Sequence, residues 1–534
     1  MKRTFFSILA CALSCCMLML MFAACSKDNN GNNNGNNNDG TTNEIETTSS
    51  SDNNDNGNVV VPPAHTTHEY NKQKPYANRI AVQATCTTPA TYYYSCSCGE
   101  VGTQTFEWGD AVSCKFENGA CKWCGKAEPA ETEGLIFSPI KNGEEYTVTG
   151  YEGTATEVYI PSTHNSKPVT SISSYGFRKN KAITSVIVGD NVTHIYNDIF
   201  SECTSLKTVV LGRSVTNLGE FAFAWCEALE SVEMPDTLTS IANSAFWMCS
   251  NLKSVKIPYG VTNIEESAFG RCDSLTTVLI PDSVTTIGKK AFSWCLKLEN
   301  IEVDEDNPNY SSLDGNLYNR DKTTLIQYAM GKTNSDFAIP SSVTTIGYYS
   351  FAYCENIVNL EIPNSVTNVE FYAFGEVSGL KYNTKDGLCY LGNSDNPYLY
   401  LADTETATIT TATIDDNCRF IGDFAFNFCM YLTEVNIGSN SKLTRIGHNA
   451  FFYCGAFESI TIPTGVTKLD APFYACTSLK NITFANTENW YITDVIDDFE
   501  SKTGGTAVNV ADSAANATNF LETYVYHYWY KSNP

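Results

Sequence analysis

The fold of this 534-residue chain is decided by the stretch AFWMCSNLKSVKIPYGVTNI, residues 245–264. Its phenylalanine, Phe246, belongs to a series in which the first six members follow one another at steps of 23 residues. A fixed period of this length is typical of a solenoid, in which each repeat forms one coil stacked on the next. The series comprises Phe177, Phe200, Phe223, Phe246, Phe269 and Phe292, then Phe351 and Phe374, then Phe426, Phe451 and Phe473.

Each repeat has the same internal order. After the phenylalanine come a cysteine, a leucine and then two apolar residues separated by one position, as in Val255 and Ile257. Such alternation predicts a short strand with one buried face. A proline such as Pro258 often ends this strand, because it lacks an N–H, and residues 261–264 predict a second short extended segment. We expect a turn or a helical corner between that segment and the next phenylalanine.

The repeated cysteine stands three residues after the phenylalanine. Stacking would place these sulfur atoms in a column about 5 Å apart, a separation that disulfide-bonded Cα atoms can have. Their Cβ vectors would run parallel, however, rather than toward one another. We therefore interpret them as small buried apolar side chains. They are Cys203, Cys226, Cys249, Cys272, Cys295, Cys354, Cys429, Cys454 and Cys476.

The pattern Ala-Phe-x-x-Cys-x-x-Leu-x-x-Val-x-Ile-Pro-x-x-Val-Thr-x-Ile resembles the BspA-type leucine-rich repeat of bacterial surface proteins. The resemblance implies a mainly β solenoid at residues 135–484, with roughly a dozen coils and short helical or turn corners. Two interruptions, headed by Asp314-Gly315 and Asp386-Gly387, are interpreted as hairpin-like insertions into single coils. Residues 485–534 are rich in aromatic side chains and are interpreted as a cap, because a solenoid end needs one. An adhesive tip is the alternative for that segment.

The start of the chain predicts export. A basic beginning, an apolar run and small residues make residues 1–24 a candidate signal peptide. The end of this segment resembles a bacterial lipobox, which implies lipidation of Cys25. An ordinary signal peptide or a membrane anchor is the alternative. Residues 25–64 are rich in Asn, Gly, Ser and Thr and are predicted to form a disordered tether. The implied location is the bacterial cell surface, on the outward-facing side of the outer membrane in a Gram-negative cell.

Residues 65–130 form a small Cys-rich module between the tether and the solenoid. Two short Cys-containing turns could supply four thiolates to a structural zinc ion. Disulfides are an equal alternative, because the number of cysteines is even and an exported module of this size needs cross-links. The candidate zinc ligands are Cys96, Cys98, Cys121 and Cys124, with His65 and His68 as further candidates.

Composition and motifs exclude several classes of function. The net charge of −25 argues against nucleic acid or anionic lipid as a partner. The six histidines are scattered and belong to no recognisable catalytic motif, so we predict that the chain is not an enzyme. Apart from the lipid anchor and the zinc alternative, we expect no cofactor, and we expect a monomer.

Aromatic residues recur one or two places after the phenylalanine. If exposed, they could form a stripe that grips protein or sugar; packing over adjacent corners is the alternative. The candidate ligand-binding residues are Trp225, Trp247, Trp294, Tyr353, Phe428 and Tyr453. The resemblance implies adhesion to host or neighbouring-cell macromolecules, commonly extracellular matrix proteins. A surface carbohydrate-binding protein is the alternative function.

Overall fold

The computed structural model describes the solenoid and segments on either side of it. The chain divides into two units, residues 1–66 and 67–534, and all described residues belong to the second. Cys25, the signal peptide and the tether therefore lie outside the described residues. No helix in the described part is long and apolar enough to cross a membrane. The described residues are 80–82, 85, 88, 90–95, 101–108, 116–117 and 120–532.

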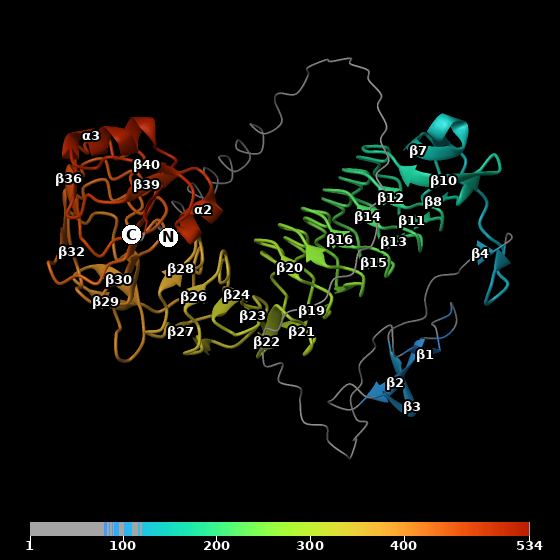
Figure 1. Cartoon of the computed structure of the whole chain (residues 1–534), viewed down its shortest axis with the longest axis horizontal. Coiled ribbons are helices and arrows are strands. Elements are labelled where there is room, and N and C mark those ends of the chain that lie inside the picture. Colours follow the sequence, from blue (N-terminus) through green and yellow to red (C-terminus); the bar gives the residue numbers. More distant parts are fainter. Residues whose placement is uncertain are drawn as a thin grey trace, which may run out of the picture. The chain divides into compact units, whose positions relative to one another are not determined.

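The predicted solenoid is confirmed, because the first strands of successive coils pair in parallel (Figure 1). Val186 pairs with Val209 and Val209 with Val232, so the register advances by one repeat from coil to coil. The first-strand row contains β8 (Glu157–Ile160), β11 (Ser185–Val188), β13 (Thr208–Val210) and β15 (Ser231–Glu233); β17 (Ser254–Lys256), β19 (Thr277–Ile280) and β21 (Asn300–Val303); β25 (Asp336–Ala338) and β27 (Asn359–Glu361); β32 (Thr411–Ile414) and β34 (Glu434–Ile437); and β36 (Ser459–Ile462) and β38 (Asn481–Phe484).

The second strand of each coil forms a similar parallel row. It is shorter, usually two residues, and Ile241 pairs with Ile264 as Ile264 pairs with Ile287. The second-strand row contains β10 (Lys167–Ile172), β12 (His194–Ile195) and β14 (Asn217–Leu218); β16 (Ser240–Ile241), β18 (Asn263–Ile264) and β20 (Thr286–Ile287); β24 (Thr324–Gln327), β26 (Thr345–Ile346) and β28 (Asn368–Val369); and β31 (Tyr400–Thr404), β33 (Phe420–Ile421), β35 (Arg445–Ile446) and β37 (Lys468–Asp470).

The corners that carry the phenylalanines are turns rather than helices. In every such coil the residues two before and two after the phenylalanine have positive φ, as at Ser244 (54°) and Met248 (59°). This conformation costs a non-glycine residue about 1–2 kcal/mol. It is retained because corner N–H groups donate to the next coil, as from Ser244 to the Glu266 carbonyl at 3.0 Å. The turn therefore continues the hydrogen-bond ladder around the corner.

The phenylalanines form a ladder inside the solenoid. The rings of Phe223, Phe246 and Phe269 are fully buried and stack with centroids 5.4 Å apart. Tyr328 continues this ladder beside Phe351, at a centroid distance of 5.3 Å. Tyr328 was not predicted as a member of the ladder, although it stands one 23-residue step before Phe351. Each such ring removed from water stabilises the fold by roughly 2–3 kcal/mol.

Both predicted insertions are antiparallel hairpins. Asp314 and Gly315 have φ of 49° and 68°, and Asp386 and Gly387 have φ of 51° and 80°. Positive φ at both central residues defines the turn for which Asp-Gly is preferred. Each hairpin continues through a third antiparallel strand into the second-strand row. The pairs are β22 (Tyr310–Leu313) with β23 (Asn316–Asn319), and β29 (Asn383–Lys385) with β30 (Leu388–Leu391).

Antiparallel strands also close both ends of the second-strand row. β6 (Leu135–Ile140) pairs with β7 (Glu145–Tyr151), which lies beside β10. At the other end β41 (Tyr528–Lys531) pairs with β37. Asn516 donates from Nδ2 to the Ile482 carbonyl at 2.9 Å, so the C-terminal segment also lies on β38. The last strands of both rows are therefore covered, which leaves their edges unavailable for pairing with another chain.

The remaining elements lie before the solenoid or in its end segments. The N-terminal elements are the antiparallel sheet β1 (Ile80–Val82), β2 (Ala90–Ser95) and β3 (Val101–Trp108), and the pair β4 (Phe116–Glu117) and β5 (Ala120–Cys121). Two short elements belong to the first coils, η2 (Lys141–Gly143) and β9 (Thr163–His164). The C-terminal segment contains β39 (Trp490–Thr493), α2 (Ile496–Ser501), β40 (Thr506–Ala507), α3 (Ser513–Thr518) and η3 (Asn519–Thr523).

Replacing Phe246 by Ala tests the ladder. We expect the free energy of unfolding to fall by about 3–5 kcal/mol, because neighbours held in a repeating stack cannot close the cavity. Urea-induced unfolding followed by circular dichroism measures this change. Lys253→Ala, at an exposed position of the same coil, is the control and should change the free energy by less than about 0.5 kcal/mol. Equal stability of the two variants would contradict the role of the ladder.

Candidate functional site

Aromatic side chains on the corners form one continuous chain of ring contacts, here called the corner strip. The contacts run from Trp247–Trp294 at 5.6 Å, through Tyr349–Tyr372 at 4.8 Å, to Tyr474–Tyr526 at 5.6 Å between centroids. The strip crosses both the regular coils and the C-terminal segment. Its members are Trp247, Trp294, Tyr349, Tyr353, Tyr372, Phe424, Phe428, Phe452, Tyr453, Tyr474 and Tyr526.

The backbone does not require aromatic residues at the corner. The position two after the phenylalanine is aromatic at Trp294, Tyr353 and Tyr453, where φ is 58°, 65° and 57°. Other coils adopt the same positive φ with unrelated side chains. Those residues are Met248, Arg271, Glu376 and Ala475. A positive φ does not favour large side chains. The presence of aromatic residues at these corner positions is therefore not explained by the backbone conformation.

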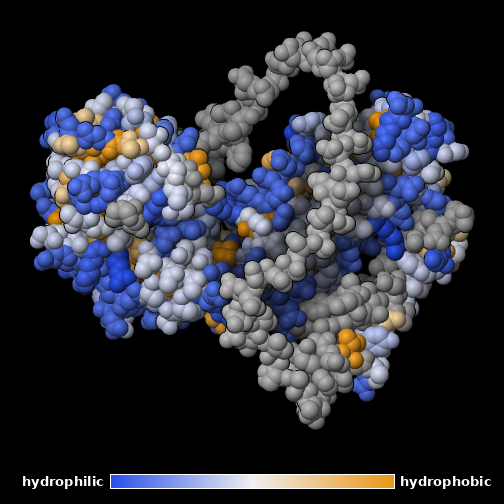
Figure 2. Space-filling model, in the orientation of Figure 1, coloured by the Kyte–Doolittle hydropathy of each residue, from blue (hydrophilic) through white to orange (hydrophobic). Residues whose placement is uncertain are grey.

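The corner strip is half-buried along most of its length. Trp247 packs over the backbone of Gly270 in the next coil, where an added Cβ would come within 2.3 Å of the ring. Exposure is greatest near the C-terminal end, where Tyr453 is 42% and Tyr526 60% exposed. Figure 2 shows one face of the molecule, on which hydrophobic residues are scattered among hydrophilic ones. The strip therefore contributes to packing and also presents accessible ring edges and faces.

The structure brings most of the predicted binding residues together. Trp247, Trp294, Tyr353, Phe428 and Tyr453 all belong to the corner strip. Trp225 does not extend it but stacks on Phe221 at 6.1 Å. The strip members two residues before the phenylalanine were not predicted, although they have the same period. These members are Tyr349, Tyr372 and Phe424.

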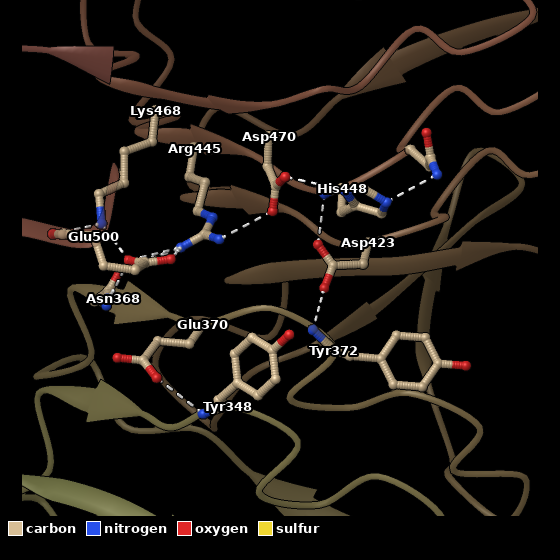
Figure 3. Close-up of polar contacts among 11 residues, drawn as sticks. Tyr348, Asn368, Glu370, Tyr372, Asp423, Arg445, His448, Lys468, Asp470 and Glu500 are labelled. Atoms are coloured by element: carbon tan, nitrogen blue, oxygen red, sulfur yellow. Dashed lines mark hydrogen bonds and ion pairs between the residues drawn. The ribbon is translucent and has the colours of Figure 1, made fainter. Parts of the chain in front are cut away.

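A cluster of charged and titratable side chains lies near the C-terminal coils and is here called the junction cluster (Figure 3). Arg445 donates from Nη1 to Glu500 Oε1 at 3.0 Å and from Nη2 to Asp470 Oδ2 at 3.4 Å. Lys468 also forms an ion pair with Glu500. The cluster was not predicted, although Asp423, His448 and Asp470 each stand three residues before a repeat phenylalanine. The members of the cluster are Glu370, Asp423, Arg445, His448, Lys468, Asp470 and Glu500.

His448 connects the two aspartates of the junction cluster. Its Nδ1 lies 3.0 Å from Asp470 Oδ1, and its backbone N–H donates to Asp423 Oδ1 at 2.6 Å. Burial, reinforced by the Asp470 carboxylate, raises the pKa of Asp423 to about 6. Burial opposes a charge on His448, but Asp470 outweighs this effect and raises the pKa of the histidine. Asp423 and His448 therefore both hold a proton more strongly than they would in water.

The other carboxyls of the cluster differ in their surroundings. Burial, followed by repulsion from Glu500, raises the pKa of Glu370. Burial also opposes ionisation of Glu500, but Arg445 and Lys468 outweigh it and hold the pKa of this carboxyl below its ordinary value. Glu500 is therefore the ionised partner of both cations, while Glu370 has no cation in direct contact among the described side chains.

The junction cluster has no room for a substrate. The cavity beside it, lined by Glu370, Asp423 and Arg445, has a volume of about 10 Å³. This volume corresponds to about one water molecule. The titratable groups instead form hydrogen bonds and ion pairs with one another. In the described part of the chain, no group of three or more His, Cys, Asp or Glu side chains is arranged to hold a metal ion.

The repeat cysteines form a buried column of thiols. Their interpretation as small buried side chains is correct but incomplete, because most of them also donate a hydrogen bond. Cys249 donates from Sγ to the Phe223 carbonyl of the preceding coil at 3.3 Å, and Cys272 does the same to Phe246. Burial raises the pKa of Cys203 and Cys295 to about 12. The same bond is formed by Cys203, Cys226, Cys295, Cys454 and Cys476.

The candidate zinc ligands are described only in part. Cys121 lies in β5 and is buried, whereas Cys124 is exposed. Cys96, Cys98, His65 and His68 lie outside the described residues. The choice between zinc and disulfides in this module therefore stays a prediction.

The fold defines a parallel β solenoid of leucine-rich repeat type. The chain matches the model of the BspA type leucine rich repeat region at residues 170–299, 326–394 and 404–499, more than half of its length, in six copies. It therefore belongs to the family of BspA-type leucine-rich repeat proteins. No match was found among curated proteins.

Solved structures include similar leucine-rich repeat proteins. A leucine rich cell surface protein of Faecalibacterium prausnitzii is 27% identical, with a TM-score of 0.42, over 71% of this chain and 98% of its own. A leucine-rich repeat protein of Bacteroides ovatus is 25% identical, with a TM-score of 0.41, over 66% and 88%. The pneumococcal vaccine antigen PcpA is 20% identical, with a TM-score of 0.43, over 67% and 88%.

The thiol column predicts low chemical reactivity. We expect the repeat cysteines to react with Ellman's reagent at about pH 8 at least about a hundred times more slowly than in the unfolded chain, because burial disfavours the thiolate. Mass-spectrometric mapping of labelled peptides identifies the thiols that react. Lys253→Cys adds an exposed thiol to the same coils and should react at the rate of the unfolded chain. Fast labelling of Cys249 in the folded protein would show that the column is open to solvent.

Proposed function

We propose that the chain is a cell-surface binding protein whose corner strip contacts an extracellular protein. The observation that carries this proposal is the unbroken series of ring contacts from Trp247 to Tyr526. Aromatic side chains offer large contact areas at low conformational cost and are enriched where binding energy concentrates. Membership of the BspA-type leucine-rich repeat family supports the same function.

The C-terminal end of the corner strip is the proposed centre of contact. Phe428 stacks on Tyr453 at 5.3 Å, and Tyr474 stacks on Tyr526 at 5.6 Å. Rings that are packed on one face and open on the other lose little freedom on binding. The strip therefore offers a preorganised surface rather than separate flexible side chains.

Display at the surface is proposed to depend on the start of the chain. A lipid on Cys25 would hold the protein in the membrane, and residues 26–64 would separate the solenoid from it. A flexible segment of this length reaches roughly 30–40 Å. The Cys-rich module would then follow as a small spacer before the first coil.

Carbohydrate binding is the second candidate function. A hollow of about 320 Å³ beside the second insertion is lined by Glu361, Asn364 and Asp395 together with other polar residues. Carboxylates and amides of this kind can hydrogen-bond the hydroxyl groups of a sugar. The volume falls within the range of small-molecule sites. A glycan that fills this hollow would not need the far end of the corner strip.

Replacing Tyr453 by Ala tests the proposed contact. We expect affinity for a bound matrix protein to fall at least about tenfold, because a central aromatic anchor contributes more than about 1.4 kcal/mol. The measurement uses the full chain on immobilised matrix proteins, beside a glycan array. The matched control is Tyr175→Ala, since Tyr175 is 58% exposed and also occupies a corner position with positive φ, outside the strip.

The outcomes separate the two functions. Protein binding that is weakened by Tyr453→Ala and not by Tyr175→Ala supports the proposal. Saturable binding to glycans alone would favour the second candidate. Equal affinities of the two variants for a matrix protein would remove the corner strip from the binding site.

A further inference from the structure

The strand ladder is interrupted between β28 and β31, which belong to different sheets. Between regular coils a corner N–H donates to a backbone carbonyl of the next coil, as from Ser244 to Glu266 and from Ser267 to Lys289. At the interruption the N–H of Tyr372 donates instead to Asp423 Oδ2 at 2.5 Å. Arg419 likewise donates from Nη1 to the Asn364 carbonyl at 2.7 Å. Side chains therefore replace backbone pairing at this junction between two groups of coils.

Glu500 on α2 connects the C-terminal segment to the coils on both sides of the same junction. Its carboxylate accepts hydrogen bonds from Asn368 Nδ2 of β28 at 3.4 Å and from Arg445 Nη1 of β35 at 3.0 Å. Lys468 of β37 contacts the same carboxylate and also donates to the Glu500 carbonyl at 3.0 Å. One side chain thus joins strands on both sides of the interruption.

Carboxyls outnumber permanent cations in the junction cluster. Only Arg445 and Lys468 carry a permanent positive charge there, and a buried charge without a partner is costly. His448 is placed to supply a third positive charge, because its Nδ1 meets Asp470 directly. One further proton on a carboxyl would complete the balance. The four carboxyls belong to Glu370, Asp423, Asp470 and Glu500.

We propose that the junction cluster is a proton-linked latch. Uptake of protons by His448 and Asp423 tightens the contact between α2 and the coils, and loss of these protons as pH rises loosens it. The device requires no ligand, because all its groups come from this chain. It is therefore independent of the proposed binding function.

The direction of the effect follows from linkage between protonation and folding. A group whose pKa is higher in the folded than in the unfolded state stabilises the fold at low pH, and this stabilisation is lost as pH rises through the folded pKa. The pKa of Asp423 rises from 3.8 to about 6, and that of His448 rises above 6.5. Stability of the junction should therefore decrease as pH rises through this window.

Other groups that face the cluster do not reverse this direction. The raised pKa of Glu370 acts in the same sense, and Glu500 weakens the junction only as pH falls below its ordinary value of 4.5. Burial raises the pKa of the neighbouring tyrosines, which stay neutral throughout the window. The remaining facing groups are Tyr348, Tyr400, Tyr528, Lys289 and Lys502.

Hydrogen exchange of the full chain at about pH 5.5 and about pH 7.5 tests the latch. The readout is the protection factor of α2, which corrects for the intrinsic pH dependence of exchange, with residues 254–264 as the internal reference. We expect protection of α2 to be at least about tenfold higher at the lower pH, since linkage of one proton allows up to about tenfold per pH unit. The reference should change less than about twofold.

The variant Asp470→Asn isolates the proposed cause. An amide at this position can still accept from Arg445 and can donate to neutral His448, but it removes the charge that favours protonation. We expect the ratio of α2 protection between the two pH values to fall below about threefold. Asp321→Asn, at an exposed position outside the cluster, should keep the wild-type ratio.

Two results would overturn the latch. The first is a wild-type protection ratio near one, which requires no variant. The second is an unchanged ratio in Asp470→Asn or, if that variant does not fold, in His448→Gln, whose side chain cannot take up a proton.

Discussion

Each coil can keep a dry interior only because the next coil lies against it, and hydrogen bonds between strands set the distance between the two. The other contacts that recur between neighbouring coils depend on the same coil-to-coil distance. The phenylalanine rings stack 5.4 Å apart, and each thiol reaches the carbonyl of the preceding coil. Thr262 donates from its hydroxyl to the carbonyl of Thr239 at 3.2 Å, and Thr239 does the same to Thr216. One spacing therefore satisfies the backbone, the core and part of the polar surface together.

An interruption of this spacing has to be repaired by side chains. The first insertion breaks the second-strand row between β20 and β24, and there the N–H of Ile287 donates to the Tyr310 hydroxyl at 2.8 Å. The second insertion leaves a break after β28, and there the Asp423 carboxylate takes the place of a backbone carbonyl. Burying charged side chains costs more free energy than burying hydrogen-bonded backbone groups, because a buried charge needs a partner of opposite charge. The junction cluster, with Glu500 brought from the C-terminal segment, is the result of that requirement.

The repeating core leaves the corners chemically unconstrained. Arg271, Glu376 and Trp294 occupy equivalent corner positions with nearly the same backbone conformation. Side chains there vary from coil to coil without a change in the backbone, and the proposed binding function rests on the concentration of rings in the corner strip. This division of roles suits a family of repeat proteins. The buried residues of the repeat are nearly the same in every coil, whereas the corner residues differ. The proposed binding function therefore depends on the corners and not on the phenylalanine ladder.

The sequence by itself determined the period, the buried phenylalanines and cysteines, and both Asp-Gly hairpins, because each depends on contacts that recur at a fixed spacing or lie within one turn. The same step applied to Phe351 reaches Tyr328, so this miss came from following one residue type. Only the tertiary structure decided which corner rings meet and which charges are paired. Glu500 contacts Asn368 across 132 residues, beyond an insertion that breaks the period. No spacing in the sequence encodes such a contact, because it depends on how the chain returns across the coils after the repeats end.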